Sequence, residues 1–122
     1  MSSETIRHVV NDKQLASLGD AFVNFIYSLA LTKIHGRPQA TKVSDRILSE
    51  AFRLADLREY LGTRRSRKDL ANAAESLLIE AYTKQLISID ESVDTLIQNP
   101  DGIEAGLSNL LKLAADRIIK AS

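Results

Sequence analysis

The chain contains no cysteine, and this absence excludes disulfide bonds and metal sites built on thiolates. It also has no glycine-rich phosphate-binding loop and no nucleophile elbow. Residues 1–11 lack a long apolar run, so we expect no signal peptide or membrane span there and a cytoplasmic location. The 122 residues are 44% hydrophobic and 26% charged, which favours a single globular domain over 1–122.

The net charge is zero, but the two signs are separated along the chain. Residues 33–68 hold ten basic and four acidic side chains, whereas residues 69–122 hold nine acidic and four basic ones. Clustered cations favour the binding of a polyanion such as a nucleic acid, because neutralising its phosphates releases condensed counterions. The alternative is a solvated loop with cations at helix C-termini. The candidate phosphate-binding residues are Arg64, Arg65, Arg67 and Lys68, with Arg37 and Lys42 upstream.

Helical periodicity predicts an all-α fold, and the only strand signal, at 86–89, is weak. We expect the six phenylalanine and tyrosine residues to belong to the core and not to stack on bases. The predicted helices run from Asn11 or Asp12 to about Ile34, from Thr41 or Ser44 to about Leu57, from about Arg67 to Gln85, from Ser88 or Asp90 to near Gln98, and from about Ile103 to Lys120.

Asp20 lies in the middle of a segment, 15–31, that is apolar on nearly every side. In a helix it shares a second apolar face with Ala16, Val23, Tyr27 and Leu31, so we expect it on a contact face and not in solvent. Carboxylates are rarely buried without a partner. That partner is either a bound cation or an ion pair or hydrogen bond with a neighbouring helix.

Asn72 and Glu75 lie three residues apart beside the apolar stripe of the predicted helix 67–85, so they project to similar sides. If this helix crosses the helix of Asp20, two carboxylates and an amide converge on a hard cation. Gly19 favours a close crossing, because glycine inside a helix costs about 1 kcal/mol relative to alanine and usually marks a close approach.

Two segments together resemble the ribonuclease III catalytic domain: Leu18-Gly19-Asp20-Ala21-Phe22 and, about fifty residues later, the run LANAAESLL at 70–78. That family carries a leucine-glycine-aspartate-alanine core on one helix. A second helix carries an acidic or polar residue three positions before a glutamate. The resemblance covers roughly 12–96, so the last predicted helix lies outside it and either closes the bundle or extends a dimer contact.

The sequence departs from the full-length family pattern at three positions. Ala16 stands where those members have a metal-ligating glutamate, Asn72 where aspartate is usual, and Lys13 where another glutamate is common. The short bacterial members called mini-ribonuclease III also have alanine and a non-acidic residue at the first two positions. The sequence is most similar to that minimal pattern.

The resemblance implies a ribonuclease III-like helical bundle that cleaves double-stranded or structured RNA with Mg²⁺, or Mn²⁺, held by Asp20 and Glu75 and assisted by Asn72. It further implies a homodimer, with the basic residues named above as phosphate contacts. From the residues themselves we expect no membrane association, and no separate double-stranded RNA-binding domain because only one predicted helix follows Gly102. Two alternatives stay open. One is a non-catalytic RNA-binding or assembly protein that keeps the fold, and the other is a helical protein–protein module whose two acids only form ion pairs.

Overall fold

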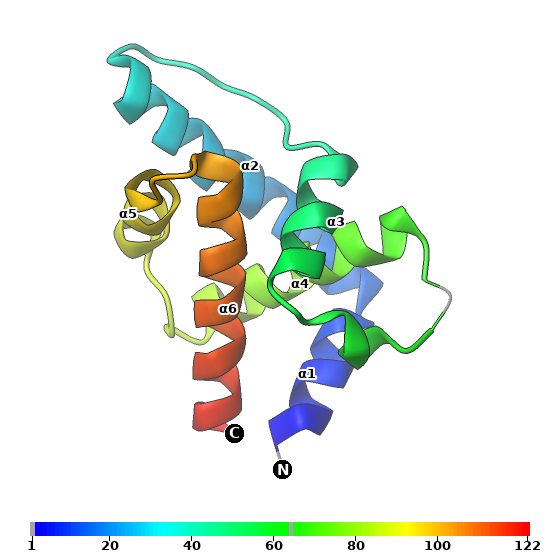
Figure 1. Cartoon of the computed structure of the whole chain (residues 1–122). Helices are drawn as coiled ribbons and strands as arrows, with labels where there is room; N and C mark the ends of the chain where they lie inside the picture. The colour runs from blue at the N-terminus through cyan, green and yellow to red at the C-terminus, as the bar shows by residue number, and fades with distance from the viewer. Residues whose placement is uncertain (1, 64) are drawn as a thin grey trace.

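The computed structural model describes residues 2–63 and 65–122, and over these ranges it is helical with no strand (Figure 1). The predicted all-α fold is confirmed, and 86–89 is not a strand. Arg64, a predicted phosphate contact, lies outside the described residues. The elements are α1 (Ser2–Val10), α2 (Lys13–His35), α3 (Asp45–Leu54), η1 (Arg58–Leu61, a 3₁₀ turn), α4 (Arg67–Thr83), α5 (Ile89–Gln98) and α6 (Ile103–Ala121).

Side-chain caps determine where four of the helices begin. The Asp12 carboxylate accepts a hydrogen bond from the backbone N–H of Leu15 at 3.0 Å, which fixes the start of α2. The starts of α3, α4 and α5 are capped in the same way by Ser44, Ser66 and Ser88. Each cap satisfies a backbone donor that has no partner inside its helix.

Two helices end earlier than the sequence predicts. α3 stops at Leu54 and α4 at Thr83, a few residues before the expected ends. Asp56 and Gln85 follow these ends, and both have a φ of 62°. A residue in this left-handed region cannot continue a right-handed helix, so the chain must turn at both positions.

The helix α1 was not predicted, although its apolar residues Ile6, Val9 and Val10 have helical spacing and are all buried. α1 packs against α4, α6 and η1, near the end of the bundle where both termini lie (Figure 1). The guanidinium of Arg7 lies 5.9 Å from the centre of the Tyr60 ring, within cation–π range. A helix this short depends on such tertiary contacts, because its propensity alone is marginal.

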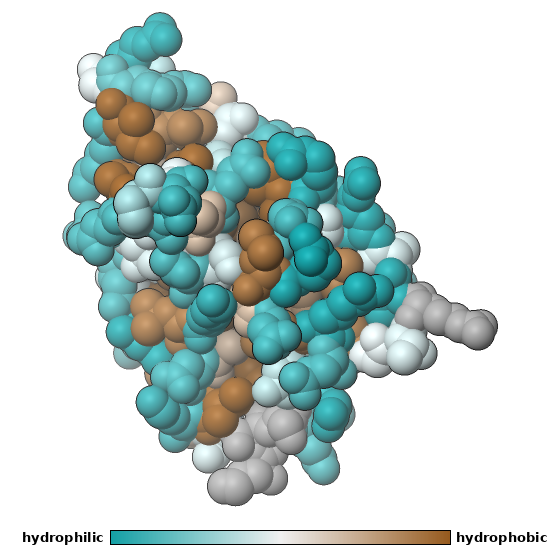
Figure 2. All heavy atoms as spheres, in the orientation of Figure 1, coloured by the Kyte–Doolittle hydropathy of each residue, from teal (hydrophilic) through white to brown (hydrophobic). Residues whose placement is uncertain are grey.

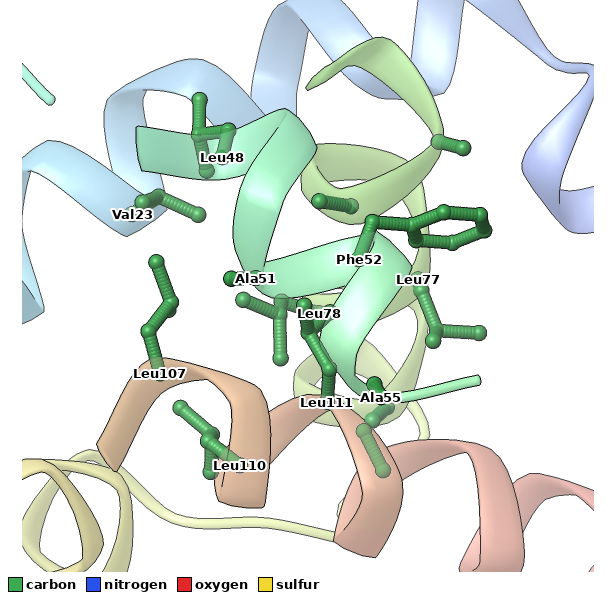
Figure 3. Close-up of a cluster of buried hydrophobic side chains, with 14 of the residues drawn as sticks. Val23, Leu48, Ala51, Phe52, Ala55, Leu77, Leu78, Leu107, Leu110 and Leu111 are labelled. Carbon is green, nitrogen blue, oxygen red and sulfur yellow. The ribbon is translucent and has the colours of Figure 1, made fainter. Parts of the chain in front are cut away.

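The core gathers where α4 packs against α2, α3 and α6. Figure 3 draws Val23, Leu48, Phe52, Leu78 and Leu107 as members of one buried cluster, in which the drawn side chains are all carbon. The helix α6 contributes a row of fully buried leucines to it, so the last helix closes the bundle. On the face drawn in Figure 2, hydrophilic side chains predominate and hydrophobic patches between them are small.

α5 and α6 pack with their backbones in contact. A Cβ atom added to Gly106 would lie 2.4 Å from the carbonyl oxygen of Leu96, so only glycine fits there. At the other end of this helix pair, the Arg117 guanidinium donates to both carboxylate oxygens of Glu91, at 2.6 and 2.8 Å, and to the carbonyl of Leu86 at 2.8 Å. The helix pair is therefore held by an apolar crossing at one end and by the hydrogen bonds of Arg117 at the other. We call the Arg117–Glu91 pair the polar tie.

The connection between α2 and α3, residues 36–44, lies along α2. Three α2 side chains spaced four residues apart bind its backbone. Thr32 Oγ1 accepts from Gln39 N, Ser28 Oγ accepts from Thr41 N, and Asn24 Oδ1 accepts from Val43 N, at distances of 3.0, 2.9 and 2.8 Å. Asp20 continues the same spacing. We call Asp20, Asn24, Ser28 and Thr32 the polar stripe of α2.

α2 is long and apolar enough, by these two measures alone, to cross a membrane. It packs against α4 and α5, which accounts for the apolar residues on its buried side. The absence of membrane association stays a prediction. The aromatic residues are only partly in the core: Phe22 is buried and stacks on Tyr82 at 4.8 Å between ring centres, but Phe25 is half-exposed and Tyr82 is partly exposed.

Candidate metal and RNA site

The crossing of α2 and α4 brings their backbones into contact at Gly19. A Cβ atom on Gly19 would lie 2.1 Å from the carbonyl oxygen of Glu75, a distance that no side chain can occupy. The predicted close approach at Gly19 is confirmed. Because Asp20 follows Gly19 on α2 and Glu75 is the contact residue on α4, the crossing places the two carboxyl groups together. A further bond, from Ser76 Oγ to the carbonyl of Asp12 at 2.9 Å, fixes the register of the two helices.

Asp20 and Glu75 interact directly, and the pKa values of their carboxyl groups are shifted in opposite directions. Burial of Glu75, followed by its hydrogen bond to Asp20 and the charge of Asp20, raises the pKa of Glu75 to about 8. The hydrogen bond that Glu75 donates lowers the pKa of Asp20 below its ordinary value of 3.8, and Lys42 adds to this. At neutral pH the pair therefore shares one proton, held on Glu75, and carries one negative charge.

Lys42 makes an ion pair with Asp20. Its Nζ lies 3.1 Å from Asp20 Oδ1, and this hydrogen bond raises the pKa of Lys42. The lysine side chain is 73% exposed and that of Asp20 is 41% exposed. Asp20 therefore lies at the contact with α4, as expected, but its side chain is partly exposed and not shielded from solvent. Apolar periodicity could not show that the connection 36–44 lies along this side of α2 and leaves an opening beside it.

The two carboxyl groups face a cavity of about 520 Å³. The predicted Asn72 lines it, as do Ala16, Lys68 and three residues that the sequence analysis did not place there as site residues: Lys13, Ser17 and Asp45. Lys68 Nζ lies 3.5 Å from Asp45 Oδ2 across the opening. Asp45 follows the cap residue of α3, and nothing in its sequence context distinguishes it from an ordinary acid in a first helical turn.

The donor set at the cavity fits a hard divalent cation. Asp20, Glu75 and Asn72 offer only oxygen and amide groups, with no thiolate or imidazole. Among the described residues no three acidic, histidine or cysteine side chains cluster closely enough to form a complete ligand set. Mg²⁺ commonly keeps several waters and takes one or two protein carboxylates, so a two-carboxylate site suits it.

The structure separates the predicted phosphate contacts into groups. Lys42 and Lys68 line the cavity, and Arg67 is exposed at the start of α4. Arg65 donates to the Leu61 carbonyl at 2.7 Å and to Asn11 at 3.2 Å, so it ties the turn before α4 to the segment before α2. Arg37 is exposed beyond the end of α2, roughly 25 Å along the helix axis from Asp20.

Comparison with known protein families agrees with this architecture. A family model described as Ribonuclease III matches residues 13–117. The match covers most of the 122 residues, and the chain therefore belongs to the ribonuclease III family. It also reaches nearly to the end of α6, so the last helix is part of the family domain and not an addition to it. No curated protein sequence matches the chain.

Proposed function

We propose that this protein is a metal-dependent endoribonuclease that hydrolyses phosphodiester bonds of double-stranded or structured RNA. The single observation that carries the proposal is the meeting of Asp20 and Glu75 at a glycine-mediated helix crossing, at the edge of a cavity bordered by lysines. Membership of the ribonuclease III family supports it independently. A buried acid with a strongly raised pKa in a polar cavity is typical of functional sites.

Asp20 and Glu75 are the metal-binding residues in this proposal, and Asn72 orients a water or offers its carbonyl oxygen. A bound Mg²⁺ supplies an activated water and neutralises charge that develops on the phosphate. Asp20 is ionised at neutral pH and ready to bind a cation. Glu75 binds one only after losing its proton, so its raised pKa weakens the site near neutral pH.

Lysines around the cavity bind the RNA backbone in this proposal. Lys13, Lys42 and Lys68 all line the cavity beside the two acids, so a phosphate placed there meets several ammonium groups. Each phosphate contact releases counterions, and affinity for RNA therefore falls steeply with salt. Arg67 extends the same surface, whereas Arg65 is held by its internal hydrogen bonds.

A homodimer through α2 completes the proposed enzyme. Leu18 and Phe25 are 55% and 51% exposed on α2, with the exposed Ala21 between them. Phe25 also borders an apolar groove of about 480 Å³ between α2 and the connection that follows it. Exposed apolar surface of this kind favours association with another chain, and a second copy would align the two α2 helices.

The test of catalysis compares the wild type with Asp20→Asn and Glu75→Gln on a structured RNA, with Mg²⁺ and with EDTA. We expect cleavage by the wild type only with metal, and a loss of at least about 100-fold in either variant. Glu80→Gln is the matched control, because Glu80 lies on α4 outside the cavity and pairs with Lys84.

Two outcomes would contradict the proposal. RNA binding without cleavage, indifferent to Mg²⁺ and to Glu75→Gln, would indicate an RNA-binding or assembly protein. No salt-dependent RNA affinity, together with a loss of stability in the Asp20 and Glu75 variants, would indicate a protein–protein module.

The dimer is tested by the molar mass in solution. We expect the wild type to be a dimer and Phe25→Asp to be a folded monomer, because the new charge would be buried without a partner at the interface. Leu54→Asp is the control, since Leu54 is a similarly exposed apolar residue on α3, at 52%. A monomeric wild type, or equal effects of both variants, would refute the α2 interface.

A further inference from the structure

Lys42 is held beside Asp20 by its neighbours in the chain. The backbone N–H groups of Thr41 and Val43 donate to Ser28 and Asn24 of α2, so the main chain on both sides of Lys42 is fixed. The Lys42 side chain is 73% exposed, with its ammonium 3.1 Å from Asp20 Oδ1. The ammonium can therefore change partners while the backbone stays in place.

The Lys42 ammonium lies beside the Asp20 carboxylate, which the proposed metal ion needs as a ligand. A divalent cation approaching Asp20 meets the lysine charge at a few ångströms, and the like charges repel each other. The ion pair engages Oδ1 of Asp20, so the lysine and the metal compete for the same carboxylate. Lys68 differs from Lys42, because its ammonium is paired with Asp45 and acts on Glu75 only through its charge.

We propose that Lys42 is an internal counter-ion of Asp20 that transfers to an RNA phosphate when RNA binds, so that RNA and the divalent cation strengthen each other's binding. The inference rests on the proposed function and adds a positioning role for Lys42 to it. A phosphate in the cavity offers the ammonium a new anionic partner and leaves Asp20 open. By reciprocity, a cation on Asp20 frees the lysine for the phosphate.

This role differs from that of a static ion pair in the direction of its effects. A lysine that only fastens the connection 36–44 would, when removed, loosen the site and weaken both ligands. A competing lysine, when removed, strengthens metal binding and weakens RNA binding. A rise in metal affinity together with a fall in RNA affinity therefore distinguishes the proposed exchange from a static ion pair.

The experiment measures Mn²⁺ binding by calorimetry without RNA, and binding of a short RNA duplex in EDTA. We expect Lys42→Gln to raise Mn²⁺ affinity roughly threefold to tenfold, since the repelling charge is removed. It should lower RNA affinity several-fold and reduce the salt dependence by about one phosphate contact. Lys42→Arg keeps the charge and should bind Mn²⁺ as the wild type does.

Lys112→Gln is the matched control, because Lys112 is an exposed lysine on α6 outside the cavity. Equal or weaker Mn²⁺ binding by folded Lys42→Gln, or unchanged RNA binding, would overturn the inference and leave the nuclease proposal standing. If Asp20→Asn binds Mn²⁺ as well as the wild type does, Asp20 is no metal ligand and both proposals fail. Thermal unfolding of each variant verifies that the protein is folded.

Discussion

Within residues 2–63 and 65–122, only glycine fits at two helix crossings, and these crossings differ in what surrounds the glycine. At the α2–α4 crossing, Gly19 contacts the backbone of Glu75, and an acid pair faces a polar cavity. At the α5–α6 crossing, Gly106 contacts the backbone of Leu96, whose side chain is fully buried. Both crossings use glycine to bring two helix backbones together. Burial of the ionisable side chain at the first crossing opposes folding, whereas burial of the apolar side chain at the second favours it.

The two buried side chains, Leu96 and Glu75, differ in their effect on the stability of the fold. Burying Leu96 removes apolar surface from water and favours folding. Burying Glu75, which is only 5% exposed, opposes its ionisation and raises its pKa to about 8. Glu75 therefore adds no stability by being ionised at this crossing, which agrees with the proposed role of its carboxyl group in binding a cation.

The largest expected effect comes from breaking the first crossing. Gly19→Ala places a methyl group 2.1 Å from a backbone oxygen that cannot move independently of α4. The helices must separate, and we expect a loss of about 3 kcal/mol or more in the free energy of unfolding, measured by urea titration. Separation also parts Asp20 from Glu75, so Mn²⁺ binding by the folded fraction should fall at least tenfold.

Gly106→Ala is the matched variant at the second crossing. Its added methyl group would lie 2.4 Å from the Leu96 carbonyl oxygen, and we expect a similar loss of about 3 kcal/mol. Mn²⁺ affinity should stay within about twofold of the wild type wherever the variant is folded, because α5 and α6 do not line the cavity. Equal losses of Mn²⁺ affinity in both glycine variants would show that the crossings are not functionally distinct.

The next effect is a fall in stability between pH 4.5 and about 8, which belongs to the first crossing. The pKa of Glu75 rises from 4.5 to about 8 on folding, so between these values the folded state binds more protons than the unfolded state. Stability of the metal-free protein should therefore fall as pH rises through this window and level off above it. Glu75→Gln removes this dependence, and we expect it to be more stable than the wild type by roughly 2 kcal/mol at pH 9.

Urea unfolding from pH 5 to 9 in EDTA measures this dependence. Glu80→Gln again serves as the control, because Glu80 is paired with a lysine at the edge of α4. A wild-type stability that stays level or rises between pH 5 and 8 would contradict the protonated state of Glu75.

The smallest effect concerns the polar tie between α5 and α6. The hydrogen bonds from Arg117 lower the pKa of Glu91, so this pair stabilises the fold above the ordinary pKa of 4.5 and loses its effect as the pH falls. Both side chains are more than a third exposed, and solvent weakens the pair. We expect Arg117→Gln to cost about 1 kcal/mol at pH 7 and little in strong acid, by the same urea titration.

The sequence predicted the parts of the site that depend on local pattern. Gly19, Asp20 and Glu75 could be related to one another because helical spacing and an unusual glycine are visible without a structure. Asp12, Ser44 and Ser88 were each one of two predicted starting residues for the same reason, since a cap acts within one turn of its own helix. The cap at Ser66 was not predicted.

The sequence did not predict what depends on contacts between distant segments. Lys42 approaches Asp20 only because the connection 36–44 lies along α2, and Asp45 reaches the cavity through the same path. The helix α1 was missed despite the helical spacing of its apolar residues, because a helix of nine residues is marginal alone and its burial depends on α4 and α6. The exposure of Phe25 was missed because an apolar stripe does not show whether a partner lies inside or outside the chain.

The polar stripe of α2 limits how the length of the chain between α2 and α3 can vary. Four residues of helix advance about 6 Å, and two residues of extended chain advance about 6.6 Å, so successive stripe residues meet Gln39, Thr41 and Val43 in step. Deleting one residue before Gln39 can be absorbed in the turn, but deleting one after it would exchange the inward and outward sides of the segment. Natural variants should therefore gain or lose residues there in pairs, or at the turn.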